Sequence, residues 1–290
     1  MSKRFGIVID GTASLPDDLA RAHDIRWLPL YVILNEERFI AGRDLSTADF
    51  YERIKAKGVV TETSQPTMQD CLDAYESVVR DGYREVVVIT IATELSGTYS
   101  VATTTAHQLD RERARVEVVD SRSVAGGIAL IATALARLRD RGGSFEDAVA
   151  LAHGLAGTVH ILAATDTLEQ LRRSGRVSNA AALFGSLLSV KPILKVADGV
   201  VSPVDRVRTR DKAVLRLKEL IAQTTGEGGR IHACVLHTND PERARTLGEW
   251  VQERYHCVEY FMAEAGPVIG ARTGPGMIGL CWYSAQDVPA

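Results

Sequence analysis

The stretch EVVVITIATELSGTYS, residues 85–100, joins a buried strand to a polar turn and the start of a helix. An unbroken run of Val and Ile is typical of a strand that is covered on both faces, as in a parallel sheet. Ser96 and Gly97 then stand where the chain turns from strand to helix. The stretch therefore predicts one strand–helix unit of an α/β domain.

Similar units lie on both sides of this stretch. Helices are expected from Ser46 to just before Gly58 and from Thr67 to Asp81, because a capping hydroxyl begins each segment and a glycine follows it. Strands separated by helix-length segments predict a parallel sheet covered by helices. The other strands expected in this half are 5–10, 26–34 and 115–120.

After residue 120 the pattern changes. Ser123 is expected to open a long helix ending near Gly142, and Ser144 to open another. Asp198-Gly199 then separates two apolar runs and favours a two-residue hairpin turn. The predicted fold class is α/β with two domains: a parallel-sheet, Rossmann-like N-terminal domain over 1–155, and a C-terminal α+β domain over 156–290 with a largely antiparallel sheet. Its strands are expected at 190–197, 200–204, 231–238, 257–263 and 277–283.

Composition narrows the function. The formal net charge is −3 and aromatic residues make up 6% of the chain, so no nucleic acid partner is expected. The four cysteines are scattered, with no histidine at ligand spacing, so they are expected to be buried free thiols and not metal or redox ligands. Because no segment resembles a membrane span or a signal peptide, the protein is expected to be cytoplasmic.

Three hydroxyl-rich segments stand where strands are expected to end, at 10–16, 63–67 and 94–99. Ligands of parallel α/β sheets bind at the carboxyl ends of the strands, so these segments are expected to face one site. Hydroxyls and the N–H groups of helix N-termini bind anions, so the predicted ligand group is small and anionic. The alternative for Thr12 and Thr67 is a role as helix caps alone.

Taken in order, these segments resemble the DegV family of bacterial fatty-acid-binding proteins over essentially the whole chain. Eight landmarks in one order make the resemblance specific. They are DGTASLP at 10–16, TSQPT at 63–67, ELSGTYS at 94–100, VVDSRS at 118–123, RRSGRV at 172–177, KPIL at 191–194, VRTR at 207–210 and GPVIGARTGPGMIG at 266–279.

The resemblance implies that a long-chain fatty acid lies in an apolar tunnel between the two domains. In family members studied with a fatty acid kinase, the carrier presents the bound acid for phosphorylation. The chain is therefore expected to be a carrier subunit and not an enzyme, with no catalytic residue, metal or cofactor. The residues expected to bind the carboxylate are Thr63, Ser64, Ser96, Gly97 and Arg272.

Two positions depart from the family pattern. Asp10-Gly11 stands where members usually have Asp-Ser, which removes one hydroxyl. Arg272 stands where a histidine commonly approaches the carboxylate. Because arginine is permanently charged and can donate two hydrogen bonds to a carboxylate, head-group binding is expected to survive without a titratable imidazole.

Two arginine-rich segments resemble family patches and suggest a docking surface for an acidic kinase, although solvated surface arginines are the alternative. The other expected partners are the fatty acid itself and, for lipid exchange only, a transient membrane contact. The residues proposed for docking are Arg173, Arg176, Arg206 and Arg208.

Two questions stay open at this level. The tunnel wall has only candidates, because apolar residues in these segments are also typical core residues. A serine-dependent acyl hydrolase or transferase using Ser96 is a competing function, as is a regulatory protein in which the lipid is a structural plug. The wall candidates are Ile91, Leu187, Leu188, Ile193, Val268 and Ile269.

Overall fold

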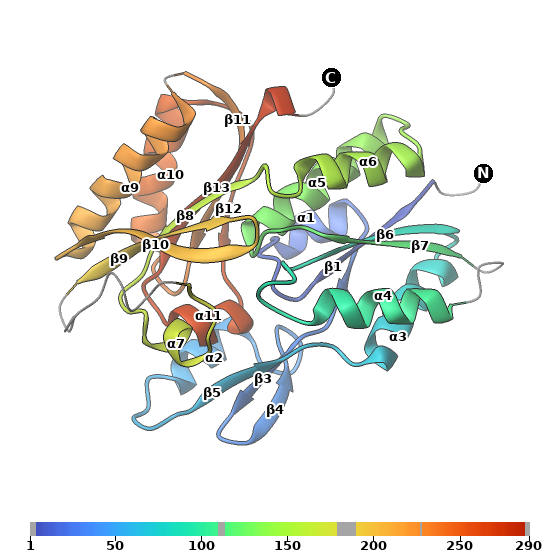
Figure 1. Cartoon of the computed structure of the whole chain (residues 1–290), viewed down its shortest axis with the longest axis horizontal. Helices are drawn as coiled ribbons and strands as arrows, with labels where there is room; N and C mark the ends of the chain where they lie inside the picture. Colours follow the sequence, from blue (N-terminus) through green and yellow to red (C-terminus); the bar gives the residue numbers. More distant parts are fainter. Residues whose placement is uncertain (1–3, 110–113, 179–189, 227, 288–290) are drawn as a thin grey trace.

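The computed structural model describes residues 4–109, 114–178, 190–226 and 228–287. A parallel sheet with strand order β2-β1-β6-β7 forms the N-terminal half, as predicted. Alternate residues of its strands enter two different cores, one under α3 and α4 and one under α5 and α6 (Figure 1). The strands are β1 (Gly6–Asp10), β2 (Ile25–Leu28), β6 (Glu85–Thr90) and β7 (Arg115–Asp120). The helices are α1 (Asp17–Ala22), α3 (Met68–Arg80), α4 (Thr98–Gln108), α5 (Gly126–Asp140) and α6 (Phe145–Leu155).

The single strand expected at 26–34 is wrong. The structure has two strands there, in two different sheets, separated at Pro29. Proline has no N–H group to donate to a neighbouring strand, so the chain leaves the parallel sheet at this point. The second strand starts a small antiparallel sheet that the sequence did not predict, with strand order β4-β3-β5. Its strands are β3 (Tyr31–Leu34), β4 (Glu37–Ile40) and β5 (Thr61–Ser64), and helix α2 (Thr47–Arg53) connects β4 to β5.

The second half contains a six-stranded sheet with strand order β10-β9-β8-β13-β11-β12. All neighbouring strands are antiparallel except β11 and β12. The predicted hairpin is present, with Asp198 and Gly199 at φ values of 48° and 77°. The strands are β8 (His160–Ala164), β9 (Lys191–Ala197), β10 (Val200–Val207), β11 (Arg230–His237), β12 (His256–Glu264) and β13 (Ile278–Ser284). The helices are α7 (Glu169–Arg173), α9 (Arg210–Thr225), α10 (Pro241–Arg254) and α11 (Pro267–Thr273), with a 3₁₀ turn at Ala285–Asp287.

Helix α5 joins the two halves. It contacts β1 and β6 of the parallel sheet and β11 and β13 of the six-stranded sheet, so one continuous apolar core spans both. Ser123 does not cap this helix, which begins only at Gly126, after Ala125 at a φ of 53°. Ser144 caps α6 as predicted. The expected domain boundary near residue 155 stays a prediction, and it lies between the end of α6 and the start of β8.

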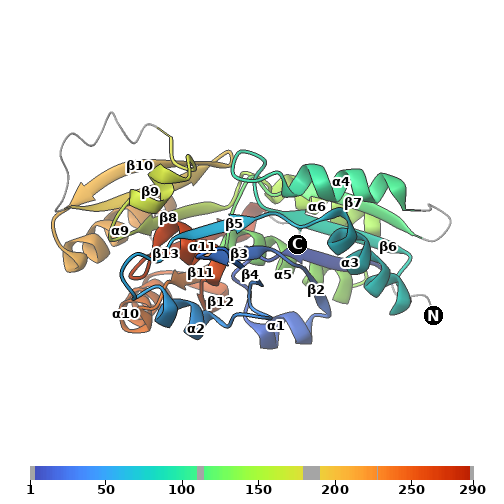
Figure 2. The same cartoon turned by 90° about the horizontal axis from the view of Figure 1, so that it is seen from below.

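Helix α11 lies between the small sheet and the six-stranded sheet. It contacts β3 and β5 on one side and α7 on the other (Figure 2). Tyr51 on α2 donates a hydrogen bond to the backbone oxygen of Ala265, just before α11 (3.0 Å). These contacts bring the end of β5 to the face of α11. None of the helices in the described ranges is long and apolar enough to cross a membrane.

The capping box of α3 gives a stability prediction. The Thr67 hydroxyl accepts a hydrogen bond from the Asp70 N–H (3.1 Å), and the Asp70 carboxylate accepts one from the Thr67 N–H (2.8 Å). Replacing an N-cap threonine by alanine costs about 1 kcal/mol, so Thr67→Ala should lower the free energy of unfolding by that amount in urea titrations. Thr104→Ala, at an exposed position inside α4, is the matched control and should change stability little. Equal losses in both variants would contradict the capping role.

Candidate functional site

A cavity of about 500 Å³ lies where the parallel sheet, the small sheet and the six-stranded sheet meet. Its wall is mainly apolar, with side chains from β8, β9, β10 and β11 opposite the loop after β6. Small side chains at Ala125 and Ala163, and Gly279, keep this interior open. The arrangement provides an apolar chamber of the kind that binds organic ligands.

All five residues predicted to bind a carboxylate line this one cavity. Thr63 and Ser64 stand at the end of β5, Ser96 and Gly97 stand just before α4, and Arg272 projects from α11. An Arg272 Nη2 group donates a hydrogen bond to the Thr63 hydroxyl. Arg272 and Thr63 are thus in direct contact although more than 200 positions separate them in the sequence. The polar edge of the cavity formed by these residues with Ser64, Ser96 and Gly97 is called the rim below.

The segments at 63–65 and 95–97 are also packed together. Gln65 lies over Gly97 so closely that a Cβ atom at position 97 would be 2.3 Å from its side-chain oxygen. The Ser96 hydroxyl contacts the Thr98 hydroxyl (2.9 Å) and accepts a hydrogen bond from the Thr98 N–H (3.3 Å). Ser96 therefore stands at the N-terminus of α4, where the helix dipole is positive and anions bind favourably.

The rim is positively charged. Among the residues that the structure describes, Arg176 and Arg272 are the charged residues in the cavity lining, and no Asp, Glu, His, Lys or Cys joins them. Burial and the nearby positive charge of Arg176 lower the pKa of Arg272, whereas Glu62 acts in the opposite direction. No described carboxylate forms an ion pair with Arg272. The site therefore holds a half-buried cation that lacks an acidic partner.

Arg176 is placed differently from the prediction made for it. Its guanidinium donates a hydrogen bond to the Leu95 oxygen (3.3 Å), next to Ser96, and its side chain lines the cavity. The sequence suggested only a docking role, because a motif cannot show that a loop after α7 returns to the loop before α4. Arg173, Arg206 and Arg208 are exposed, as docking residues would have to be.

The wall candidates have mixed outcomes. Ile91, Val268 and Ile269 line the cavity. Ile193 does not, because it faces the core beneath α9. Leu187 and Leu188 lie outside the described residues.

The helix-capping role considered for the loop at residues 10–16 is wrong. Neither Asp10 nor Thr12 caps α1, whose N-cap position is Pro16. The buried Asp10 carboxylate instead accepts hydrogen bonds from the Thr12 N–H (2.8 Å), the Thr12 hydroxyl and the Ile91 N–H. It thereby joins the loops that follow β1 and β6, and Thr12 lines the cavity. The residue-level prediction missed Gln65 and Thr273, although both lie within segments that the sequence singled out.

Among the described residues, the cavity lining offers binding groups and contains no His, Lys, Asp or Glu that could act as a base for Ser96. Within the described ranges, the Ser96 hydroxyl has hydrogen-bond contacts only with Thr98, and a serine nucleophile needs a base in contact with it. No group of three or more potential metal ligands occurs in the described part of the chain. Cys71, Cys234 and Cys281 are buried free thiols and Cys257 is partly buried. The geometry therefore suits recognition of an anion attached to an apolar body.

Known proteins share both the sequence pattern and this fold. The model of the DegV family, described as an uncharacterised protein family, matches residues 4–285. A DegV domain-containing protein of Streptomyces coelicolor is 34% identical over 281 residues, covering 97% of this chain and 98% of the relative. Protein DegV of Bacillus subtilis is 33% identical over 277 residues, covering 95% of this chain and 98% of the relative.

Solved structures agree with this match. The crystal structure of DegV, a fatty acid binding protein from Bacillus subtilis, superimposes with a TM-score of 0.86 at 32% identity, covering 98% of this chain and 100% of that one. A DegV family protein from Thermus thermophilus, described by its fatty acid binding, gives 0.88 at 29% identity, with 97% and 99% coverage. Because the match extends over nearly the full length in sequence and in fold, this chain belongs to the DegV family.

Proposed function

We propose that this protein is a cytoplasmic carrier that binds one long-chain fatty acid, with the acyl chain inside the apolar cavity and the carboxylate at its polar rim. The observation that carries the proposal is the charge of the lining: the charged residues there are two arginines at the edge of an apolar chamber. A ligand that complements this lining is an anion with a long hydrocarbon body. The fatty acid binding described for the relatives from Bacillus subtilis and Thermus thermophilus supports the same ligand class.

The carboxylate would be held by groups from three segments. Arg272 supplies the charge, Thr63 and Ser64 supply hydroxyls from β5, and Ser96 with Gly97 supplies a hydroxyl and the N-terminus of α4. Hydrogen bonds that involve a charged group contribute about 1.5 to 3 kcal/mol each. The head group therefore gains orientation as well as affinity from the rim.

The tail would provide most of the affinity. Burial of a methylene group contributes about 0.8 kcal/mol, so a tail of roughly fifteen carbons contributes on the order of 12 kcal/mol before the entropic cost of binding. No single rim contact approaches that value. The cavity interior therefore decides whether a lipid binds, and the rim decides how its carboxylate is placed.

We further propose that the protein presents the carboxylate to a fatty acid kinase subunit, which would phosphorylate it. Arg173, Arg206 and Arg208 are exposed and carry the charge that would suit an acidic partner surface. Arg176 also has an exposed side chain while lining the cavity, so it would lie between the bound head group and the partner. Lipid exchange would need only transient membrane contact. A hydrolase that uses Ser96 is disfavoured by the lack of a base in the described lining.

Separate roles of tail and head give the first functional prediction. Ala163→Trp should fill the cavity and abolish binding of palmitate in a fluorescence titration of the delipidated protein, because the tail loses its space. Ser96→Ala should weaken binding by about tenfold to a hundredfold, since one hydrogen bond to a charged head is lost. Val204→Trp, at an exposed position on β10, is the control and should bind like wild type. Complete loss of lipid in a folded Ser96→Ala variant would contradict this division.

The arginine in the lining predicts the pH dependence of binding. Arg272 keeps its charge at physiological pH, and fatty carboxyl groups are ionised well above a pKa of about 4.3, so wild-type affinity should be flat between about pH 6 and pH 8. Arg272→His introduces a group that is charged only below a pKa of about 6.5, so its affinity should rise as the pH falls. Isothermal titration with palmitate checks both. A wild-type affinity that changes with a midpoint near 6.5 would refute the assignment of Arg272.

The unpaired charge also predicts a stability effect in the lipid-free protein. Arg272→Met removes a half-buried cation that burial and Arg176 disfavour, so the free energy of unfolding should stay within about 0.5 kcal/mol of wild type or increase. Arg139→Met is the control, because Arg139 is 11% exposed and donates to the backbone oxygens of Phe5 and His23. It should destabilise by about 2 kcal/mol or more. Urea unfolding measures both, and a larger loss for Arg272→Met than for Arg139→Met would count against a ligand-dependent charge.

A further inference from the structure

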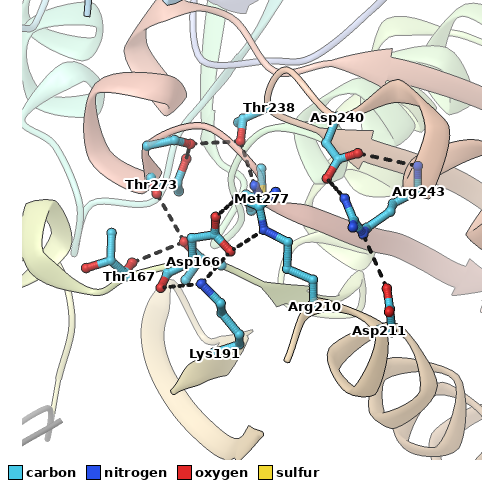
Figure 3. Close-up of polar contacts among 12 residues, drawn as sticks. Asp166, Thr167, Lys191, Arg210, Asp211, Thr238, Asp240, Arg243, Thr273 and Met277 are labelled. Atoms are coloured by element: carbon cyan, nitrogen blue, oxygen red, sulfur yellow. Dashed lines mark hydrogen bonds and ion pairs between the residues drawn. The ribbon is translucent and has the colours of Figure 1, made fainter. Parts of the chain in front are cut away.

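A cluster of charged and hydroxyl side chains surrounds Asp166 and extends to Thr273, the residue after Arg272 (Figure 3). At its centre is Asp166, which follows β8 and is 19% exposed. Its Oδ1 atom accepts hydrogen bonds from Lys191 Nζ (2.9 Å) and Arg210 Nε (2.9 Å), and Oδ2 accepts a second bond from Arg210. One carboxylate thus joins the end of β8 to β9 and to the first residue of α9.

The same carboxylate packs against the loop formed by residues 274–277, which follows α11. Gly276 has a φ of 87°, and a Cβ atom there would lie 3.0 Å from Asp166 Oδ2 and 3.2 Å from Arg210 Nη2. The ion pair therefore occupies the space beside Gly276 that a side chain at this position would need. The positive φ and this close approach together explain why a glycine occupies the position.

Thr238 holds the opposite side of loop 274–277. Its hydroxyl donates to the Gly274 oxygen (2.8 Å) and accepts from the Met277 N–H (2.8 Å), and its backbone oxygen accepts from the Gly276 N–H (2.6 Å). Neutral hydrogen bonds from Thr238 therefore hold the loop, and the Asp166 ion pairs lie beside its Gly276.

This loop continues directly from the residues of the cavity rim. Thr273 and Met277, at its two ends, line the cavity together with Arg272. The Thr165 hydroxyl, adjacent to Asp166, lies 3.0 Å from the Thr273 oxygen. A change in the position of loop 274–277 would consequently be transmitted to the last turn of α11, where the Arg272 side chain begins.

The charge of Asp166 is maintained in the folded protein. Burial alone would raise the pKa of this carboxyl group, but the hydrogen bonds and charges of Arg210 and Lys191 outweigh burial and hold its pKa below the ordinary value. If the carboxylate were neutral, Lys191 and Arg210 would lose their ion pairs with it, and Arg210 would keep only the more distant charge of Asp240. Removal of one partner from a partly buried ion pair is usually destabilising.

We propose that Asp166 is a positioning residue for the fatty acid head group: its ion pairs with Lys191 and Arg210 fix loop 274–277 and thereby orient Arg272 toward the carboxylate. This inference rests on the proposed function. Arg210 thereby belongs to this ion-pair cluster and is not assigned to partner docking, because its guanidinium is already bound to Asp166.

Head-group discrimination provides the test. The ratio of the affinities for palmitic acid and for hexadecanol, an uncharged analogue of equal length, reports contacts with the carboxylate and cancels effects on the tail. Asp166→Asn should lower this ratio at least fivefold, through weaker acid binding with unchanged alcohol binding. Asp205→Asn is the matched control, because Asp205 also pairs with an arginine, Arg216, but neither residue lines the cavity. It should keep the wild-type ratio.

The outcomes distinguish failure of the positioning role of Asp166 from failure of the proposed function. An unchanged ratio in folded Asp166→Asn, with wild type favouring the acid, would overturn the positioning role. Equal losses of acid and alcohol binding would also overturn it, because they indicate a general effect on the cavity. If Asp166→Asn does not fold, Arg210→Met removes the partner that is 46% exposed and must lower the ratio. A wild-type protein that binds both ligands equally, or neither, would refute the proposed function itself.

Discussion

The candidate site depends on a positive charge held at the edge of an apolar chamber. Arg272 is half-buried, contacts the Thr63 hydroxyl and faces the like charge of Arg176 without an acidic partner in the described residues. A protein keeps such a group only where the surrounding packing holds it in place. Here α11 is packed between the small sheet and the six-stranded sheet, and loop 274–277 is fixed behind it.

This constraint accounts for several unrelated features of the chain. The small sheet carries Thr63 and Ser64 to α11, the loop after β6 carries Ser96 to the same place, and β8 to β11 supply the apolar wall. No one sheet makes the site alone. The cavity therefore exists only because α5 joins the two larger sheets through one continuous core.

Much of the fold could be predicted from the sequence because its signals are local. Runs of Val and Ile, the caps at Ser46, Thr67 and Ser144, and the Asp198-Gly199 turn each act over a few residues. The small sheet was missed because its strands are short, because β5 is polar, and because Pro29 interrupts what looked like one strand. The predicted rim residues all line one cavity, although only Ser96 and Gly97 follow a strand of the parallel sheet. Thr63 and Ser64 end a strand of the antiparallel small sheet, and Arg272 lies on α11.

The sequence could not predict to which face of a sheet each side chain of an apolar run points. It also could not predict which loops, distant in the sequence, lie side by side in the fold. Ile193 and Leu194 are equally apolar neighbours, yet successive strand residues point to opposite faces, so Ile193 packs beneath α9 while Leu194 lines the cavity. Arg176 lies at the rim because the loop after α7 contacts the loop before α4, and no sequence motif predicts that contact. The Asp166 cluster joins four segments and was invisible for the same reason.

The identity of residue 272 as an arginine determines how the charge of the rim depends on pH. A histidine would make the charge of the site depend on pH near neutrality, whereas an arginine keeps it constant. The most direct measurement of the central claim is native mass spectrometry of the purified protein after incubation with a long-chain fatty acid. The account predicts one fatty acid per chain in wild type and none after the cavity is filled at Ala163. A wild-type chain that stays at its lipid-free mass, with a folded charge-state distribution, would contradict it.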